Sequence, residues 1–281
     1  MNLKDLSIII FDTMINKEKE KEFHDNWAKS VSLSDINFKE TNECSTSPEL
    51  RKINKVLNNV KNLNILDVGC GLGEFSVYMA SKGANVCALD ISIKMCNKTK
   101  SLALLHDLRV ETIVIDSDNI KLDPSKENFF DVIYVENTLH HVDIESTLNK
   151  LLKYLSLKGT FISWDPLKYN PLINIYRKMA SKVRTDDEHP FSRADIKKIT
   201  DKFLNNRVFY FWLTTLIIFI LMYLIDKKHP SDYRYWKEIV RENKRWAKTY
   251  LKLEKLDKFF LKIPYLKYLC WNVLIISSNK K

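Results

Sequence analysis

The sequence predicts an α/β fold built around one mainly parallel β-sheet with helices on both faces. Two observations predict it. From residue 64 onward, short apolar segments typical of buried strands alternate with amphipathic segments typical of helices. A glycine-rich turn at residues 69–73 follows the first predicted strand and opens a helix. Parallel strands joined by helices are covered on both faces, so the alternation indicates a doubly covered sheet.

The elements follow in a regular order along the chain. Strands are expected where an apolar run is bounded by turn residues, and helices where apolar residues recur every three or four positions. The first five predicted strands cover 64–69, 85–90, 110–116, 129–135 and 158–165, and the helices between them begin after Gly73 and cover 94–106 and 144–155. Next come a helical segment at 165–183, a helix at 193–203, a strand at 207–215, an apolar helix at 216–225, a basic helical region and a last strand at 269–278.

Both ends of the chain add helices to this core. Residues 17–43 are polar, with Phe23, Trp27, Val31 and Leu33 at helix-compatible spacing, which predicts one or two helices that form a lid. About fifty residues separate the last two strands, where a short connection is usual. We therefore expect a helical cap at 1–60, a core at 61–165, a substrate-side insertion and helix at 166–206, and the last two strands with an apolar and basic helical insertion at 207–281.

The composition favours a packed intracellular globule. Hydrophobic residues make up 45% of the 281 residues, with only five Gly and seven Pro, so the chain can bury enough apolar surface to offset its conformational entropy. The five cysteines form no CxxC pair, which argues against a disulfide framework or a zinc site. No signal peptide is visible, and we expect a cytoplasmic protein. Most of the net charge of +10 lies from Asp226 onward, where fifteen basic residues face six acidic ones.

The turn at residues 69–73 carries the most chemical information. Gly69, Gly71 and Gly73 form a G-x-G-x-G sequence directly after a predicted strand, where glycines let a ligand approach the backbone. A dinucleotide site would have its third glycine one position later and a pyrophosphate at the helix N-terminus. That position is Glu74, whose carboxylate would repel a pyrophosphate. The turn therefore favours a ligand without phosphate.

Acidic residues accompany the strand ends around this turn. Asp67 lies just before the glycines, where it can face a positively charged amino-acid group. Asp90 ends the second strand and is placed to bind both hydroxyls of a ribose. Asp116 ends the third strand, where it suits an adenine amino group. These positions indicate a nucleoside ligand with a cationic end.

In these features the chain resembles the class I S-adenosylmethionine (SAM)-dependent methyltransferases, and most closely their ubiquinone- and menaquinone-methylase-like small-molecule branch. The resemblance covers residues 22–165 closely. Singly, none of its motifs is specific, whereas the ordered set is. The motifs are LDVGCGLGE at 66–74, Asp90, Asp116 with Asp118, FFDVIYVENTLHHV at 129–142 and LLKYLSLKGTF at 151–161.

The resemblance implies a Rossmann-like, mostly parallel sheet of seven strands, with the last strand between the fifth and the sixth. It also implies SAM as cofactor at the carboxyl ends of the strands, S-adenosylhomocysteine as product, and in-line transfer of the sulfonium methyl group to a nucleophile. Asp67 and Gly73 are among the implied cofactor contacts, and Gly69, Cys70 and Gly71 are expected along the methionine and ribose. Asp90 is expected at the ribose, Ile91, Asp116 and Ser117 at the adenine, and Glu136 and Asn137 at the methionine end.

Candidate catalytic residues follow the fourth and fifth strands. His140 and His141 come directly after the fourth strand, near the expected methyl group, and Asp165 ends the fifth strand. A histidine oriented by a carboxylate is a suitable base for a hydroxyl acceptor, and similar sugar O-methyltransferases carry His and Asp at matching places. In the alternative interpretation, these histidines only cap a helix or fill a wall.

The substrate side is expected to come from the lid and the segment after the fifth strand. Trp27, Tyr176, Arg177 and His189 are the candidate acceptor contacts, and Arg184, Asp187 and Glu188 extend this polar rim. A solvated loop with local ion pairs explains the rim equally well. His140, His141, Glu188 and His189 do not have a recognised metal-ligand spacing, so we expect no metal.

Residues 208–225 contain no charged side chain and approach the length of about 20 residues that a membrane span requires. A span would leave the last strand on the wrong side of the bilayer, so a strand followed by an apolar helix is the better interpretation. That helix either packs internally or, with the basic and aromatic residues after it, contacts an anionic membrane at the inner face.

We therefore expect a SAM-dependent methyltransferase that acts on a small, hydrophobic or amphiphilic, lipid-like acceptor, with O- or C-methylation favoured. The sequence after the fourth strand is ENTLHH rather than the DPPY- or NPPF-type tetrad of amino-group and nucleobase methylases, which disfavours an adenine or exocyclic-amine acceptor. Two alternatives stay open. Basic residues interleaved with aromatics also occur in RNA methyltransferases, although no RNA-binding module accompanies them. The other alternative is a non-catalytic SAM-binding partner subunit.

Overall fold

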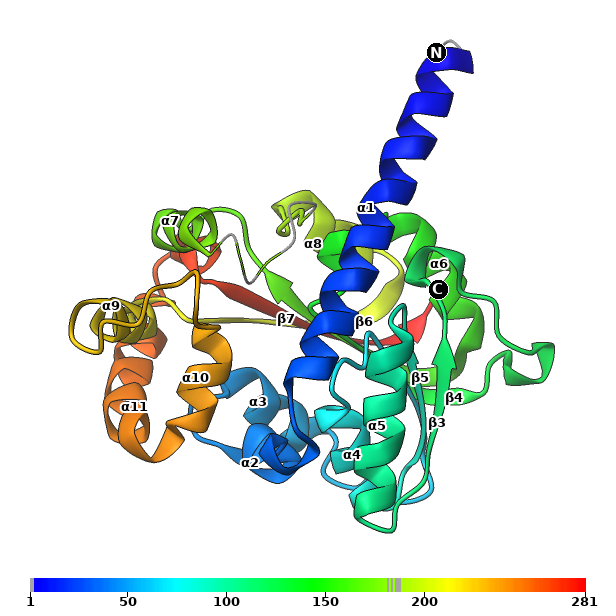
Figure 1. The fold of residues 1–281 in the computed structure, drawn as a ribbon, viewed down its shortest axis with the longest axis horizontal. Helices are drawn as coiled ribbons and strands as arrows, with labels where there is room; N and C mark the ends of the chain where they lie inside the picture. The colour runs from blue at the N-terminus through cyan, green and yellow to red at the C-terminus, as the bar shows by residue number, and fades with distance from the viewer. Residues whose placement is uncertain (1–2, 181, 183, 185–187) are drawn as a thin grey trace.

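A seven-stranded sheet in the order β3-β2-β1-β4-β5-β7-β6 forms the centre of the molecule (Figure 1). The computed structural model describes residues 3–180, 182, 184 and 188–281, with side-chain surroundings from Lys17 onward. Strands β1 to β5 pair in parallel, and β7 pairs antiparallel with both β5 and β6, as the resemblance implied. The strands are β1 (Asn64–Val68), β2 (Asn85–Asp90), β3 (Val110–Val114), β4 (Phe130–Glu136), β5 (Leu155–Pro166), β6 (Phe203–Phe211) and β7 (Asn272–Lys280).

Helices cover both faces of the sheet, because successive strand residues point to opposite faces. On β1, Ile65 packs in one apolar cluster with residues of α3 (Pro48–Val56), α4 (Glu74–Ser81) and α5 (Ile93–Leu105). Leu66 packs in a second cluster with residues of α6 (Ile144–Tyr154) and α8 (Arg193–Thr200). The doubly covered sheet that the sequence pattern predicted is therefore confirmed.

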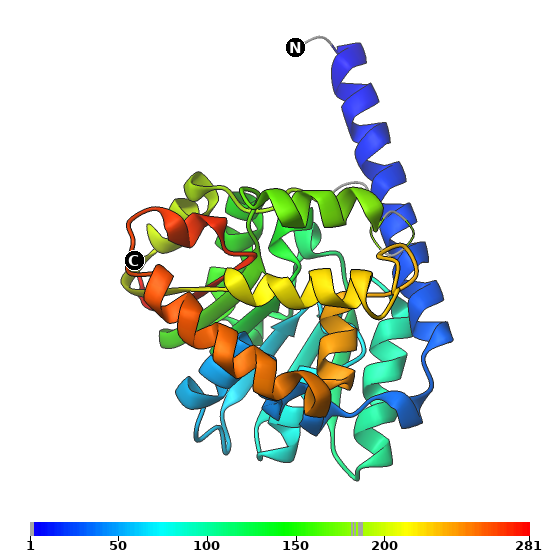
Figure 2. The same ribbon diagram turned by 90° about the vertical axis from the view of Figure 1, so that its left-hand side faces the viewer.

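The N-terminal cap begins with α1 (Leu3–Ser30), a single long helix that starts well before the predicted boundary at residue 17. Its N-terminal half extends away from the rest of the molecule in both ribbon views (Figures 1 and 2). Its C-terminal half packs beside α5, where Lys98 donates a hydrogen bond to the Val31 carbonyl. The short helix α2 (Phe38–Glu43) then leads to α3 and contacts α4.

Strand β6 ends at Phe211, four residues before the predicted end at 215. Trp212 turns the chain with a φ of 69°. The backbone N–H groups after it form hydrogen bonds with a buried carboxylate rather than with a neighbouring strand. The N–H groups of Leu213 and Thr214 both donate to Asp257. The strand therefore ends where Asp257, distant in sequence, accepts the backbone hydrogen bonds. An apolar pattern along the strand cannot predict such a contact.

The long insertion between β6 and β7 contains α9 (Ile217–Leu224), α10 (Tyr235–Arg241) and α11 (Asn243–Phe260), which lie together at the left end of the molecule in Figure 1 and face the viewer in Figure 2. Ile218, Phe219 and Met222 of α9 are buried in an aromatic cluster that includes Tyr176 of α7 (Pro171–Met179), and Leu224 is 64% exposed. The apolar helix thus packs internally on one face. Among the described residues, no helix is long and apolar enough to span a membrane.

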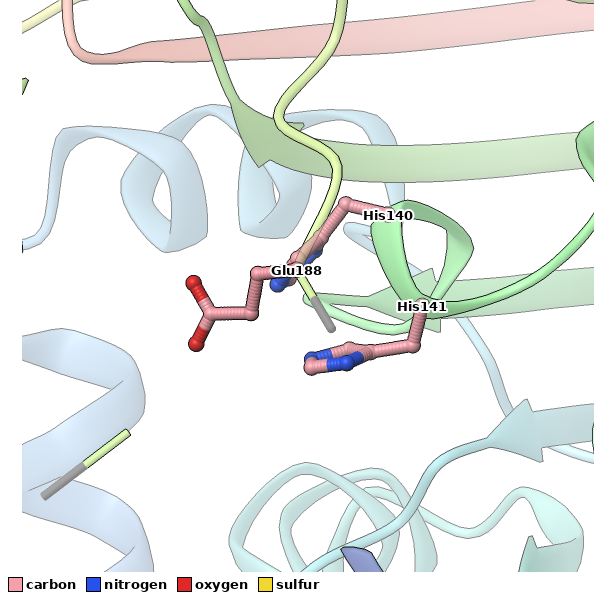
Figure 3. A group of neighbouring side chains, drawn as sticks. All are labelled: His140, His141 and Glu188. Atoms are coloured by element: carbon pink, nitrogen blue, oxygen red, sulfur yellow. The ribbon is translucent and has the colours of Figure 1, made fainter. Parts of the chain in front are cut away.

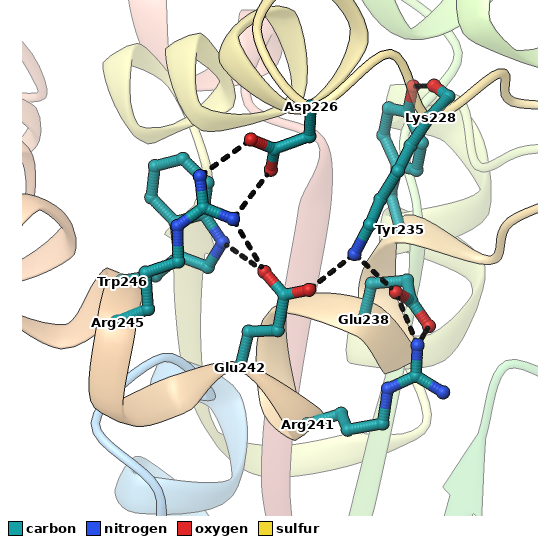
Figure 4. Close-up of polar contacts among 8 residues, drawn as sticks. All are labelled: Asp226, Lys228, Tyr235, Glu238, Arg241, Glu242, Arg245 and Trp246. Atoms are coloured by element: carbon teal, nitrogen blue, oxygen red, sulfur yellow. Dashed lines mark hydrogen bonds and ion pairs between the residues drawn. The ribbon is translucent and has the colours of Figure 1, made fainter.

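A network of ion pairs connects the helices of this insertion (Figure 4). Lys228, after α9, pairs with Glu238 at 2.6 Å and also with Glu242. Glu242 also pairs with Arg245 at 3.2 Å and accepts a hydrogen bond from the Trp246 indole at 3.1 Å. Because Glu238 is 8% and Lys228 15% exposed, these pairs are shielded from water more than ordinary surface pairs. The network fixes α10 relative to α9 and α11.

Candidate active site

The glycine turn joins β1 to α4 in a conformation that requires glycine. Gly69 has a φ of 78°, and a Cβ atom added there would lie 2.0 Å from the Thr138 hydroxyl. Gly71 has a φ of 52° and open space on its Cβ side. The backbone N–H of Gly71 donates to Asp90 at 3.0 Å, so the turn is held against the end of β2. A ligand can therefore approach the main chain closely at Gly71.

One continuous cavity of about 260 Å³ lies at the carboxyl ends of the strands. This is where ligands bind in open parallel sheets. The cavity brings together predicted residues from the lid, the strand ends and the segment after β4. The predicted residues that line it are Trp27, Asp67, Gly69, Cys70, Gly71, Asp90, Ile91, Asp116, Ser117, Glu136, Asn137, His140, His141, Tyr176, and the rim residues Arg184 and Glu188.

Four predicted residues, namely Gly73, Asp165, Arg177 and His189, are not among those that line the cavity. Gly73 is the N-cap of α4 and packs against Thr99, and Asp165 lies behind His140. Arg177 donates hydrogen bonds to Asn174 and to the Leu167 carbonyl. The predicted rim residue Asp187 lies outside the described residues.

The fourth is His189, whose side chain is exposed. Its backbone N–H donates to the His140 carbonyl at 2.7 Å. The contribution that the structure describes for His189 is therefore to anchor the turn that carries His140.

Carboxyl groups crowd the part of the cavity next to the glycine turn. Burial raises the pKa of Asp67 to about 7 and that of Glu136 to about 7; Glu136 adds to the shift of Asp67, and Glu74 adds to that of Glu136. Burial also raises the pKa of Glu49 to about 7 and that of Asp90 to about 6. Desolvated carboxylates without sufficient cations are stabilised by a positively charged ligand. This part of the cavity therefore suits a ligand with cationic groups.

Two predicted acidic positions already have partners. Lys17 of α1 pairs with Asp116 at 2.5 Å and with Asp118 at 2.7 Å. Glu74 pairs with Lys237 of α10 and accepts a hydrogen bond from Thr41 at 2.8 Å. The lid helix and the insertion thus contact the two ends of the nucleoside-binding region directly.

The strongest candidate for a catalytic group is His140, in the turn after β4. Its Nδ1 atom lies 2.7 Å from Oδ1 of Asp165, and its backbone N–H donates to the same oxygen at 3.2 Å. Both side chains are buried. Burial lowers the pKa of His140 well below 6.5, and His141 and Arg184 lower it further. With the Nδ1 proton donated to Asp165, Nε2 of the neutral ring is left as an acceptor.

His141 is a neighbour of His140 rather than a second member of the buried pair. The two ring centroids are 4.2 Å apart, and Nδ1 of His141 lies 3.7 Å from Oε1 of Glu20. Donor atoms of His140, His141 and Glu188 lie within 4.8 Å of one another (Figure 3). Glu188 is also paired with Arg184, a cation that competes with a metal ion for the carboxylate.

Several lining residues come from parts of the chain where the sequence indicated no site. Arg234, Trp236 and Lys237 belong to α10 or its N-terminal boundary, and Trp212 and Trp271 flank the insertion. The only sequence signal for them is the abundance of basic and aromatic residues in the insertion, which also fits a membrane or RNA surface. Their place depends on how α10 packs.

Comparison with known proteins agrees with this geometry. Residues 66–163 match the family model described as a methyltransferase domain. Sterol 24-C-methyltransferase of Saccharomyces cerevisiae is 30% identical over 131 residues, which are 45% of this chain and 34% of that protein. Ubiquinone biosynthesis O-methyltransferase of Rickettsia typhi is 27% identical over 156 residues, or 53% of this chain and 60% of that protein. The chain thus spans less than two thirds of either relative.

The fold also occurs among solved structures. Phosphoethanolamine N-methyltransferase 2 from Haemonchus contortus, in complex with S-adenosyl-L-methionine, has a TM-score of 0.55 at 16% identity and covers 83% of this chain and 52% of that chain. At this identity the likeness concerns the fold. Together with the domain match over the glycine turn and the strand ends, the sheet order identifies the family, whose cofactor is SAM. The chain therefore carries the domain of the class I SAM-dependent methyltransferases.

Proposed function

We propose that this protein transfers the methyl group of SAM to a hydroxyl oxygen of a small acceptor, with His140 as the general base. The observation that carries the proposal is the buried His140–Asp165 pair, because its imidazole lines the same cavity as the glycine turn. A base within the cofactor cavity suits an acceptor that loses a proton during transfer. A purely structural histidine would not need to face this cavity.

The cofactor is proposed to lie along the glycine turn. Asp90 would accept the ribose hydroxyls, and Ile91, Asp116 and Ser117 would surround the adenine. Asp67 and Glu136, whose pKa values are both raised by burial, would face the ammonium and sulfonium charges of SAM. The remaining proposed contacts at this end are Gly69, Cys70, Gly71 and Asn137.

The proposed reaction is a single displacement. The acceptor oxygen forms a bond to the methyl carbon while the bond from that carbon to sulfur breaks, and the electron pair of that bond remains on S-adenosylhomocysteine. The hydroxyl proton moves to Nε2 of His140. Asp165 stabilises the resulting imidazolium through Nδ1. Positioning of the two reactants in one cavity supplies much of the acceleration.

Aromatic walls support a hydrophobic or amphiphilic acceptor. Trp27, Tyr176, Trp212, Trp236 and Trp271 line the cavity. The names of the relatives include methylation at carbon, oxygen and nitrogen. C-methylation therefore stays the second candidate, and it also uses a base where the carbon loses a proton.

Methyl-labelled SAM incubated with the protein and a total cell extract tests the proposed activity. Label in a small-molecule product, in either the organic or the aqueous fraction, is the expected result. Label in RNA would support the RNA-methyltransferase alternative and contradict the proposal. No transfer by a protein that binds SAM would support the non-catalytic partner subunit.

Membrane contact remains a separate prediction, which rests on the exposed face of α9. Ile217, Leu224 and Ile225 are 43%, 64% and 67% exposed. Exposed apolar residues near basic ones favour anionic bilayers. Flotation with anionic vesicles tests this: binding that is lost in a Leu224→Ser/Ile225→Ser variant is expected, and no binding at low salt contradicts it.

A further inference from the structure

We propose that the acceptor carries an oxyanion, a phosphate or a carboxylate, which Arg184 and Arg234 bind on the His140 side of the cavity. This inference rests on the proposed methyl transfer and adds the chemical class of the acceptor to it. Guanidinium groups bind both kinds of oxyanion through paired N–H donors.

Both arginines line the cavity and are partly withdrawn from water. Arg184 lies between α7 and α8, with a side chain that is 16% exposed, and Arg234 is the N-cap residue of α10. Burial lowers the pKa of Arg184 and lowers that of Arg234 to about 10. Tyr176, buried on α7, interacts electrostatically with both guanidinium groups. Two segments distant in sequence therefore place their cations around one aromatic residue.

A further arginine, Arg177, lies near Arg184 without lining the cavity. Burial lowers the pKa of Arg177 to about 9, and its Nε atom has no hydrogen-bond partner among the described residues. Arg184 is the arginine that pairs with Glu188, and Arg177 adds a second positive charge next to it. A desolvated, uncompensated cation is costly, and an anionic ligand would offset that cost.

Arg234 contacts aromatic rings, and the described part of the chain shows no carboxylate paired with it. Its Cζ atom lies 3.8 Å from the ring centroid of Trp27 and 5.2 Å from that of Phe23, both on α1. Stacking fixes the plane of a guanidinium and leaves its N–H groups available for a ligand. The backbone beside it is also fixed, since the Tyr235 hydroxyl donates to the Lys228 carbonyl within the ion-pair network (Figure 4).

The carboxylate of SAM is a less suitable occupant than an anion on the acceptor. Arg184 pairs with Glu188, whose carboxylate lies within 4.8 Å of ring nitrogens of His140 and His141, so Arg184 lies on the side of the base. Lys237 lowers the pKa of Glu136, and the raised pKa values of Asp67 and Asp90 come from burial first and from other acids second. The buried acids therefore line the cofactor side of the cavity, whereas Arg184 lies beside the base.

Four proteins test this inference: the unaltered chain, Arg184→Gln, Arg234→Gln and the control Arg207→Gln, which removes an exposed arginine on β6. Calorimetry would measure the affinity for S-adenosylhomocysteine, and the affinities for inorganic phosphate and for acetate with and without that product. Circular dichroism would confirm that each variant is folded.

We expect saturable binding of at least one anion to the unaltered chain, weaker by about tenfold or more in Arg184→Gln and Arg234→Gln and unchanged in Arg207→Gln. The better anion distinguishes a phosphate from a carboxylate. The affinity for S-adenosylhomocysteine should stay the same in all four proteins.

Two results would overturn the inference. One is no saturable binding of either anion, or anion binding that the two variants leave intact. The other is a loss of S-adenosylhomocysteine affinity in Arg184→Gln and Arg234→Gln, which would assign the arginines to the cofactor carboxylate. Failure of the unaltered chain to bind S-adenosylhomocysteine would instead refute the proposed function, and it would be seen separately from the anion titration.

Discussion

Oδ1 of Asp165 lies 2.7 Å from Nδ1 of His140, and both side chains are buried at the edge of the cavity that contains the glycine turn. The same oxygen accepts the backbone N–H of His140, so the ring and its turn are positioned together. Residues that are 25 positions apart in sequence meet because β4 and β5 are adjacent and parallel. This pair is the basis of the proposed mechanism.

Replacement of either partner should slow methyl transfer more than it weakens cofactor binding. His140→Ala should lower turnover by about 10²-fold or more, because the base is lost. Asp165→Asn should also lower it, since the ring loses its fixed tautomer. Initial rates with labelled SAM measure this, and calorimetry with S-adenosylhomocysteine measures binding. His229→Ala, an exposed histidine of the insertion, is the control; unchanged turnover in His140→Ala would remove this residue from the mechanism.

The pH profile of turnover should report the lowered pKa of His140. Because burial lowers this pKa well below 6.5, the ring stays neutral and basic as the pH falls to that value. With saturating substrates, we therefore expect that protonation of His140 does not reduce turnover as the pH is lowered to about 6.5. A profile that falls with an apparent pKa near 7 and becomes flat in Asp165→Asn would contradict the assigned direction.

Asp90 is predicted to be essential for cofactor binding. It accepts the N–H groups of Gly71 at 3.0 Å and Ser92 at 2.9 Å, which places its carboxylate beside the turn. Asp90→Ala should weaken SAM binding by about tenfold or more, because charge-assisted bonds to the ribose are lost. Asp35→Ala, an exposed position in the cap, should leave affinity unchanged. An affinity loss below tenfold in Asp90→Ala would refute the ribose role.

Cofactor binding should release protons near neutral pH. Burial raises the pKa of Asp67 and Glu136 to about 7, so both are partly protonated in the free protein, and a cationic ligand favours their ionised forms. SAM affinity should therefore fall as the pH is lowered from about 8 to about 6. Calorimetry in buffers of different ionisation enthalpy measures the release, and Asp67→Asn should reduce it. Equal proton counts in both proteins would contradict the link to Asp67.

In the protein without cofactor, the raised pKa values of Asp67 and Glu136 make folding stability decrease as the pH rises, whereas cofactor affinity increases. These carboxyls bind protons more tightly in the folded chain than at their ordinary pKa values of 3.8 and 4.5. Their contribution to stability is therefore favourable at low pH and declines as the pH rises from about 4.5 through about 7.

The ion-pair network of the insertion should stabilise the fold measurably. Glu238, 8% exposed, pairs with Lys228 and with Arg241 at 2.6 Å (Figure 4). Glu238→Ala should lower the free energy of unfolding by about 1–3 kcal/mol, because the partly buried Lys228 loses one of its two carboxylate partners. Urea denaturation measures this, with the exposed Glu127→Ala as control. Equal stabilities of the two variants would show that the network contributes little.

The sequence predicted those parts of the fold and site that depend on local patterns. Gly69 and Gly71 adopt positive φ in a strand-to-helix turn, and Asp67, Asp90 and Glu136 line the cavity because parallel strands end at one edge. The order of β5, β7 and β6 followed from the family resemblance. Roles for these residues in binding and catalysis remain predictions.

The other half of the cavity could not be predicted, since it depends on contacts between distant segments. Arg234 reaches the cavity only because ion pairs position α10 and because Trp27 of α1 stacks on it. Arg177 was expected to contact the acceptor, but it turns toward the Leu167 carbonyl. Strand β6 ends early because Asp257 on α11 satisfies the backbone of Thr214. None of these relations has a periodicity that a single sequence displays.

Transfer of labelled methyl groups from SAM to cell-extract metabolites, compared between the unaltered chain and His140→Ala, tests the central claim most directly. The account predicts a labelled small molecule with the unaltered chain and a loss of about 10²-fold or more in its rate of formation with the variant, at unchanged S-adenosylhomocysteine affinity. Equal labelling by both proteins, or no small-molecule product from a chain that binds the cofactor, would contradict it.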